Sequence, residues 1–232
     1  MKRTIYVMMA FALLLASCTG KKATDGNPFY AQWKTPFGVP PFEQIKNRDY
    51  MPAIDSGINA AKTEINAIAN STDEPTFANT IAAYDKGGDL LNRVMMVFYS
   101  QTSANTNDSL QNIEMEVAPK VAAFYDEVLL NAKLFERIKK VYDNRENEKL
   151  TGEEMYLLEN LYKSFVRNGA LLSPAQQDTL KSLNQKISTL TVKFGQNVLA
   201  ETNKFKLVID NEADLKGLPD AVKAIAAEKA KA

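Results

Sequence analysis

The side chains of this chain that could take part in chemistry are mainly carboxylates, because the 232-residue sequence contains no histidine and a single cysteine. Acidic residues cluster at Glu114/Glu116, Asp126–Glu127 and Glu153–Glu154. Glu114 and Glu116 are two positions apart in a helical pattern, so they do not face each other. Carboxylates alone can bind a hard cation such as calcium, but no EF-hand spacing is present. We therefore assign no catalytic residue and no metal ligand in this sequence.

Three polar residues at expected helix ends are the remaining candidates. Asn79 and Thr80 follow the start of a helix, where such side chains commonly bond to free backbone groups. Arg167 lies near the end of another helix, where a positive charge is favourable. A guanidinium group can also bind a carboxylate of a ligand in a bidentate pair. We favour a structural role for all three residues, with ligand contact as the alternative.

The start of the sequence has the pattern of a secreted lipoprotein. Lys2 and Arg3 precede an apolar run, Ile5–Leu15, that is too short for a good membrane-spanning helix. The run ends in Leu-Ala-Ser-Cys, which resembles the bacterial lipobox. Residues 1–17 are therefore predicted to be a lipoprotein signal peptide, and Cys18 is predicted to carry the lipid that anchors the protein to a membrane. A plain signal peptide with an incidental cysteine is the alternative.

The residue after Cys18 is Thr19 rather than aspartate, which by resemblance to enteric lipoproteins favours the outer membrane. The expected location is therefore the periplasm or the cell surface. Residues 18–40 are polar and contain several glycines and prolines, so we interpret them as a lipidated cysteine followed by a flexible tether. We expect the aromatic residues of this tether to pack on the folded domain rather than bind a ligand; they are Phe29, Tyr30, Trp33 and Phe37.

The elements that must position the candidate residues are helices. From residue 41 to residue 232 the apolar residues recur mostly at helical spacing, which predicts an all-α domain. The expected helices cover about residues 49–70, 76–100, 110–128, 134–141, 151–168, 173–202 and 220–232. One short strand is expected near 205–209, where apolar Phe205, Leu207 and Ile209 alternate along the chain. The last helix has no C-cap signal, so we expect the domain to be truncated.

Local signals fix several of these helix ends. Thr76 is a plausible N-cap, and Thr151–Glu154 forms a capping box. Pro52 is placed in the first turn of its helix, and Pro174 at the first helical position. Gly87–Gly88 is interpreted as a kink or a close helix contact within the helix that Thr76 begins.

The charge balance excludes one class of function. The chain has 28 basic and 28 acidic residues, so its formal net charge is zero. A nucleic-acid-binding domain typically carries a basic face or a high isoelectric point. No nucleic-acid partner is expected.

Several short motifs resemble those of one peptidase family, in the order and with the spacing found there. The most informative is Pro75–Ile81, which resembles the signature "PTF-x-NTI" of the M3 zinc oligopeptidases, the group of thimet oligopeptidase, oligopeptidase A and bacterial peptidyl-dipeptidase. Further matching stretches are Pro41–Ile54, Leu91–Phe98, Leu134–Ile138 ("LF-x-RI"), Phe165–Ala170 ("F-x-R-x-GA") and Leu215–Pro219 ("L-x-GLP").

The resemblance implies a helical fold in which this chain is the amino-terminal half, forming one wall of a channel that admits short peptides. It also implies that zinc is bound on the other half, by a His-Glu-x-x-His motif and a later glutamate, none of which maps onto this sequence. We therefore expect a peptidyl-dipeptidase-like enzyme that is monomeric at full length, and an inactive fragment here. Asn79, Thr80 and Arg167 become possible peptide-channel or structural residues. The alternative is a non-catalytic helical lipoprotein with a peptide-binding or structural role.

Overall fold

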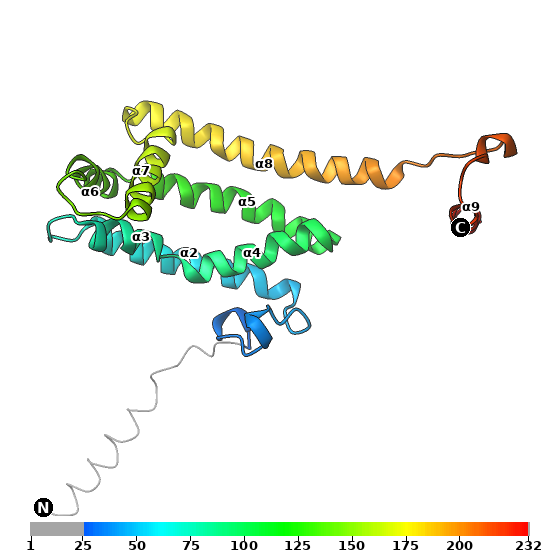
Figure 1. Ribbon diagram of the computed structural model, residues 1–232, viewed down its shortest axis with the longest axis horizontal. Coiled ribbons are helices and arrows are strands. Elements are labelled where there is room, and N and C mark those ends of the chain that lie inside the picture. The colour runs from blue at the N-terminus through cyan, green and yellow to red at the C-terminus, as the bar shows by residue number, and fades with distance from the viewer. Residues whose placement is uncertain (1–25, 232) are drawn as a thin grey trace, which may run out of the picture. The chain divides into compact units, whose positions relative to one another are not determined.

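The computed structural model describes residues 26–231, and the regular elements of this part are helices without a strand (Figure 1). This confirms the all-α fold class. The chain divides into two compact units, one ending at Val192 and the other beginning at Lys193. The α-helices are α2 (Asn47–Ala69), α3 (Ala83–Asp85), α4 (Asp89–Ala104), α5 (Asp108–Leu129), α6 (Ala132–Asp143), α7 (Gly152–Arg167), α8 (Pro174–Lys204) and α9 (Asp220–Lys229). Short 3-10 turns lie at η2 (Pro28–Tyr30), η3 (Pro36–Gly38) and η5 (Glu212–Leu215), and a π-helix, η4, covers Phe77–Ala82.

Helix α2 organises the first unit, because it packs against α3, α4, α5 and α6. Its contact with α4 depends on Gly57, where an added Cβ would lie 2.8 Å from the Cα of Leu91. The helix begins at Asn47, before the predicted start at Asp49, because the carboxylate of Asp49 accepts a hydrogen bond from the backbone N–H of Lys46 (2.7 Å). Pro52 consequently lies in the second turn, so its placement in the first turn was wrong.

The single helix expected over residues 76–100 is interrupted. Thr76 is its N-cap, as predicted, but η4 and α3 end before Gly87–Gly88 and α4 begins afterwards. Gly88 has a φ of +78°, a left-handed conformation that favours glycine. The pair is therefore a full break between two helices rather than a kink inside one.

Helix α7 begins and ends with local capping structures. The predicted Thr151–Glu154 capping box is present, with both reciprocal hydrogen bonds. At the other end the N–H of Ala170 donates to the carbonyl of Phe165 (3.0 Å) and that of Gly169 to Val166 (3.1 Å). This is a Schellman ending, with Gly169 at φ +98°.

The first half of α8 is joined to α5 by two side-chain hydrogen bonds. The amide of Asn184 donates to the carboxylate of Asp126 (2.6 Å), and the amide of Gln185 donates to the carbonyl of Pro119 (2.8 Å). Gln185 of α8 thus bonds directly to the backbone of α5. Pro174 is the first residue of α8, as predicted.

Part of the segment expected to be a flexible tether is packed on the helices instead. Phe29 is fully buried, and the Tyr30 hydroxyl donates to the carbonyl of Pro52 (2.9 Å). Arg93 on α4 donates to the carbonyl of Phe29 (2.6 Å) and lies over the ring of Trp33. This confirms for Phe29, Tyr30 and Trp33 the expectation that the aromatic residues pack on the folded domain, because burial of their rings outweighs the entropy of a free chain. Phe37, by contrast, is fully exposed.

The short strand predicted near 205–209 is absent from the part of the chain that the structure describes, where these residues form neither a helix nor a strand. Backbone groups of a strand require a neighbouring strand, and one run of alternating residues cannot supply it. Phe205 and Leu207 are both 76% exposed. The assignment of these residues as a strand was therefore wrong.

The signal peptide 1–17 and Cys18 lie outside the described residues. Among residues 26–231, no helix combines the length and apolar character that crossing a bilayer requires.

Candidate functional site

The segment that carries the PTF-x-NTI motif begins with a reciprocal cap. The hydroxyl of Thr76 accepts a hydrogen bond from the N–H of Asn79 (3.2 Å), and the side-chain oxygen of Asn79 accepts from the N–H of Thr76 (2.9 Å). The Asn79 amide also donates to the carbonyl of Glu74 (2.9 Å). Thr80 is fully buried, and its hydroxyl donates to the oxygen of Asn79 (2.8 Å). Asn79 and Thr80 thus hold the start of η4.

Arg137 on α6 joins this segment to the rest of the domain and was not singled out from the sequence. One terminal nitrogen donates to the carbonyls of Ser71 (3.0 Å) and Asp73 (2.8 Å). The other lies 3.3 Å from both the Asn79 oxygen and the Thr80 hydroxyl. Arg137 is only 7% exposed. The available signal was a charged residue within the apolar face of the LF-x-RI stretch, because a buried arginine requires partners.

Arg167 is exposed in the last turn of α7. No hydrogen bond or ion pair within the described residues joins it to Asn79 or Thr80, so the structure does not bring the three sequence candidates into one site. Its position at the carboxyl end of a helix is one where a positive charge is favourable.

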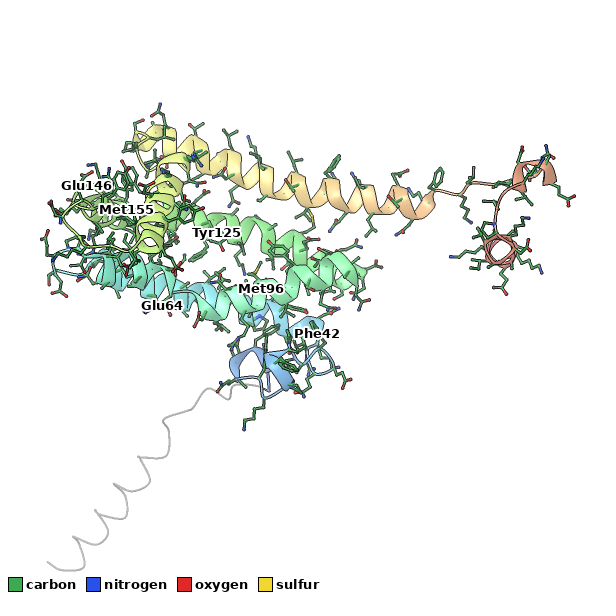
Figure 2. The ribbon with its side chains drawn as sticks, viewed as in Figure 1. Phe42, Glu64, Met96, Tyr125, Glu146 and Met155 are labelled. Atoms are coloured by element: carbon green, nitrogen blue, oxygen red, sulfur yellow. The ribbon has the colours of Figure 1, made fainter. Side chains whose placement is uncertain are left out.

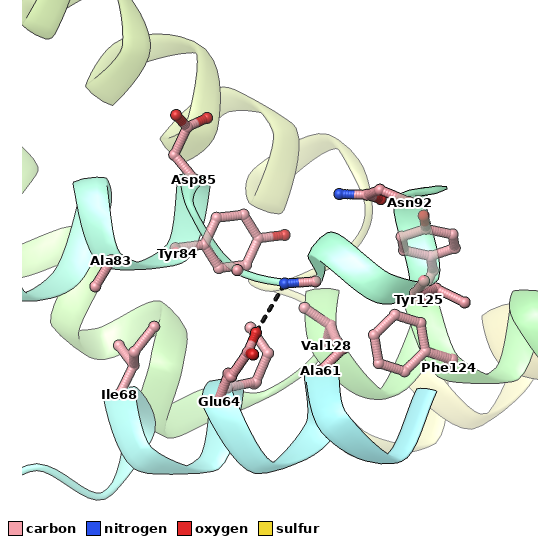
Figure 3. A pocket seen from close by; sticks show the side chains of 14 residues that line it. Ala61, Glu64, Ile68, Ala83, Tyr84, Asp85, Asn92, Phe124, Tyr125 and Val128 are labelled. Carbon is pink, nitrogen blue, oxygen red and sulfur yellow. Dashed lines mark hydrogen bonds between the residues drawn. The ribbon is translucent and has the colours of Figure 1, made fainter. Parts of the chain in front are cut away.

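The motif segment leads directly into a pocket of about 180 Å³ in the first unit (Figure 3). Helix α3 follows η4 and supplies Ala83, Tyr84 and Asp85 to its wall. A π-helix often marks a functional position in a chain. Glu64 enters from α2 and Tyr125 from α5 (Figure 2). The complete lining is Ala61, Glu64, Ile65, Ile68, Ala83, Tyr84, Asp85, Gly87, Gly88, Leu91, Asn92, Phe124, Tyr125 and Val128.

The carboxylate of Glu64 stabilises the backbone that lines the pocket. It accepts a hydrogen bond from the backbone N–H of Gly88 (2.7 Å), drawn as the dashed line in Figure 3. A carboxylate at the beginning of α4 is also favoured by the helix dipole. Glu64 therefore holds the Gly87–Gly88 turn against α2.

Tyr84 is held in place by a series of aromatic contacts. Its ring meets Phe165 of α7 edge-on at 5.9 Å, and Phe165 stacks on Phe135 of α6 at 6.1 Å. Burial, with a smaller effect of the nearby Tyr125 phenol, raises the pKa of Tyr84 above its ordinary value. The Tyr84 hydroxyl is therefore a neutral hydrogen-bonding group at physiological pH.

The residues present do not fit a zinc site. The sequence contains no histidine. Within residues 26–231, no group of three or more cysteine, aspartate or glutamate side chains is arranged to hold a metal ion. The site thus consists of a capped segment and an apolar pocket with polar groups at its edge.

Comparison with known proteins finds that this helical module is similar to one part of several peptidases. No protein-family model matches the chain. The dipeptidyl carboxypeptidase of Escherichia coli K12 is 39% identical over 208 residues, which are 90% of this chain and 30% of that protein. The dipeptidyl carboxypeptidase of Salmonella typhimurium is 36% identical over 88% of this chain and 30% of its own length. Oligopeptidase A of Escherichia coli K12 is 22% identical over 85% of this chain and 29% of its own length.

The chain is therefore homologous to one part of the dipeptidyl carboxypeptidases and oligopeptidases A, which belong to the M3 peptidase family. It spans about 30% of the length of the dipeptidyl carboxypeptidases that it matches. This confirms the predicted resemblance of the chain to the M3 family.

Proposed function

We propose that this chain is the amino-terminal, channel-wall part of a zinc metallopeptidase that cleaves short peptides in the manner of a peptidyl-dipeptidase. The observation that carries the proposal is the 39% identity to a dipeptidyl carboxypeptidase over 90% of this chain. The chain supplies helical scaffold and peptide contacts in this proposal, and the catalytic groups lie in another part of the enzyme.

An uncovered apolar face on α8 supports a role as one wall of a larger structure. Leu183, Ile187 and Leu190 follow one another at helical spacing and are 49%, 59% and 63% exposed. Phe194 continues the same row and is 71% exposed. Soluble proteins seldom leave a continuous apolar row in water, so we propose that further protein covers it in the whole enzyme.

The metal belongs to the whole enzyme in this proposal, because the donor set of this chain does not fit it. Zinc would be held by histidines and a glutamate outside this sequence and would activate the attacking water. No catalytic or metal residue is assigned within the 232 residues.

We further propose that the enzyme is anchored through a lipid on Cys18 and faces the periplasm or the cell surface, with the outer membrane favoured. The support is the basic, apolar and Leu-Ala-Ser-Cys order of the first eighteen residues. Mass spectrometry of the mature amino terminus tests this proposal. Acyl chains on Cys18 are expected, and an unmodified Cys18 would contradict it.

A paired activity assay tests the peptidase proposal. The 232-residue chain, incubated with zinc and a short peptide, should show no cleavage. The complete product of the same gene should cleave that peptide and lose activity on treatment with a metal chelator. Zinc-dependent cleavage by the 232-residue chain would contradict the proposal, as would an inactive complete product.

A further inference from the structure

The pocket between α2, α3, α4 and α5 has an apolar floor of limited size. Ile68, Leu91 and Val128 contribute aliphatic side chains from three different helices. The volume of about 180 Å³ is well below the roughly 300–1,000 Å³ of sites that enclose a drug-sized ligand. A space of this size suits one side chain rather than a complete small molecule.

The edge of the pocket carries polar groups that the protein does not use. The hydroxyls of Tyr84 and Tyr125 and the amide of Asn92 make no hydrogen bond within residues 26–231. Figure 3 shows the Tyr84 ring directed toward the side of the pocket where Asn92 and Tyr125 lie. Phenol and amide groups can donate to a carbonyl and accept from an N–H. They therefore match the backbone of a peptide on either side of an inserted side chain.

The charge of the pocket argues against an acidic side chain as the occupant. Glu64 and Asp85 both line it, and no basic residue does.

A basic side chain is also a poor occupant. Because Glu64 already accepts the hydrogen bond from Gly88 and Asp85 is exposed, neither acidic residue lies free at the apolar floor. A buried ammonium group without a dedicated partner would be unfavourable there.

We propose that this pocket binds an apolar side chain of a peptide, while Tyr84, Asn92 and Tyr125 bond to the adjacent peptide backbone. The inference rests on the proposed function, since a peptidase that acts on short peptides must hold parts of them away from the catalytic groups. The pocket acts in this way as a specificity site on the helical wall.

Methyl NMR of the 232-residue chain tests this inference with three blocked tripeptides, Gly-Leu-Gly, Gly-Gly-Gly and Gly-Lys-Gly. The leucine peptide should shift the methyl signals of Ile68, Leu91 and Val128 and leave that of Ile138 unchanged. It should bind about ten-fold or more tightly than the glycine peptide, because a leucine side chain is buried. The lysine peptide should bind no better than the glycine peptide. Equal binding of all three, a preference for lysine, or no shift at the pocket methyls would overturn the inference.

A pair of matched variants tests the polar edge. Tyr125→Phe keeps the ring and removes the hydroxyl, and it should weaken binding of the leucine peptide about five-fold. Tyr125 is 44% exposed, so the substitution leaves the fold intact. Tyr156→Phe, at a position 70% exposed on α7 and outside the pocket, should leave binding unchanged. Equal effects of the two substitutions would contradict the assignment.

The two proposals can fail separately. If the 232-residue chain binds no peptide but the complete enzyme is active, only the pocket assignment is wrong. If the 232-residue chain binds the leucine peptide selectively but the complete gene product is inactive, the peptidase proposal is wrong and the pocket assignment stands.

Discussion

Arg137 and Arg167 lie on two helices that pack together, α6 and α7, and their environments are opposite. Arg137 is buried and bonds to two backbone carbonyls, Asn79 and Thr80. Arg167 is exposed at a helix end. Sequence reasoning selected Arg167 and passed over Arg137. Both arginines stand in motifs, so the motifs alone do not distinguish them. The hydrogen-bond partners of Arg137 are distant in sequence and are visible only in the structure.

Replacement of the two arginines should therefore have unequal effects. Arg137→Met should lower the free energy of unfolding by about 2–4 kcal/mol, because several buried acceptors lose a charged donor. Arg167→Met removes only a charge at a helix end and should cost less than about 1 kcal/mol. Urea denaturation of both variants measures the difference. Equal losses would contradict the role given to the Arg137 network.

Glu154 provides a pH-dependent contribution to stability. Hydrogen bonds from the backbone N–H and the hydroxyl of Thr151 lower the pKa of Glu154 below its ordinary value of 4.5. A carboxyl with a lowered folded-state pKa stabilises the fold above its unfolded pKa and loses this effect as the pH falls through the folded value. Wild type should therefore lose stability relative to Glu154→Gln as the pH falls through and below the ordinary glutamate value of 4.5. Denaturation at several pH values measures this, and a constant difference would count against the capping-box assignment.

At the scale of the elements, sequence reasoning succeeded where the determinants are local. The cap at Thr76, the Thr151–Glu154 box and Pro174 each depend on residues within four positions of one another, and the structure has all three. It failed at Gly87–Gly88, where a helix break is stabilised by Glu64 from another helix. It also failed at residues 205–209, where the existence of a strand depends on a partner that no local pattern reveals.

The end of α7 gives a sharp test of element packing. Gly169 has φ +98°, and an added Cβ would lie 2.7 Å from Leu180 and 3.0 Å from Leu172. Gly169→Ala should therefore cost at least about 1–2 kcal/mol, from backbone strain and displaced side chains. Gly152 begins the same helix with open space around it, so Gly152→Ala should be neutral or slightly stabilising. Thermal unfolding of both variants measures this, and tolerance of alanine at Gly169 would refute the Schellman ending described here.

At the scale of the whole molecule, the sequence indicated the apolar row of α8 but not its exposure. Spacing along one helix identifies a face, and only the packing of other segments decides whether water reaches it. The pocket was likewise beyond sequence reasoning, because its lining comes from residues between Ala61 and Val128 that four helices and a turn bring together.

The exposed row predicts self-association of the 232-residue chain. Ile187→Lys combined with Leu190→Glu should shift sedimentation toward the monomer, because it breaks the apolar row without changing the net charge. The control pair Ser182→Lys and Asn203→Glu introduces the same charges at exposed polar positions of α8 away from the row and should leave association unchanged. A wild-type chain that is a clean monomer with a sharp thermal transition would contradict the claim that this row needs a cover.

The most direct test of the central claim is to read the coding DNA beyond the codon for Ala232. The account predicts an open frame of several hundred codons that encodes His-Glu-x-x-His and a later glutamate, since the matched dipeptidyl carboxypeptidases are about three times as long as the region they share with this chain. A stop codon directly after Ala232 would contradict the claim and leave a peptide-binding or structural lipoprotein as the function.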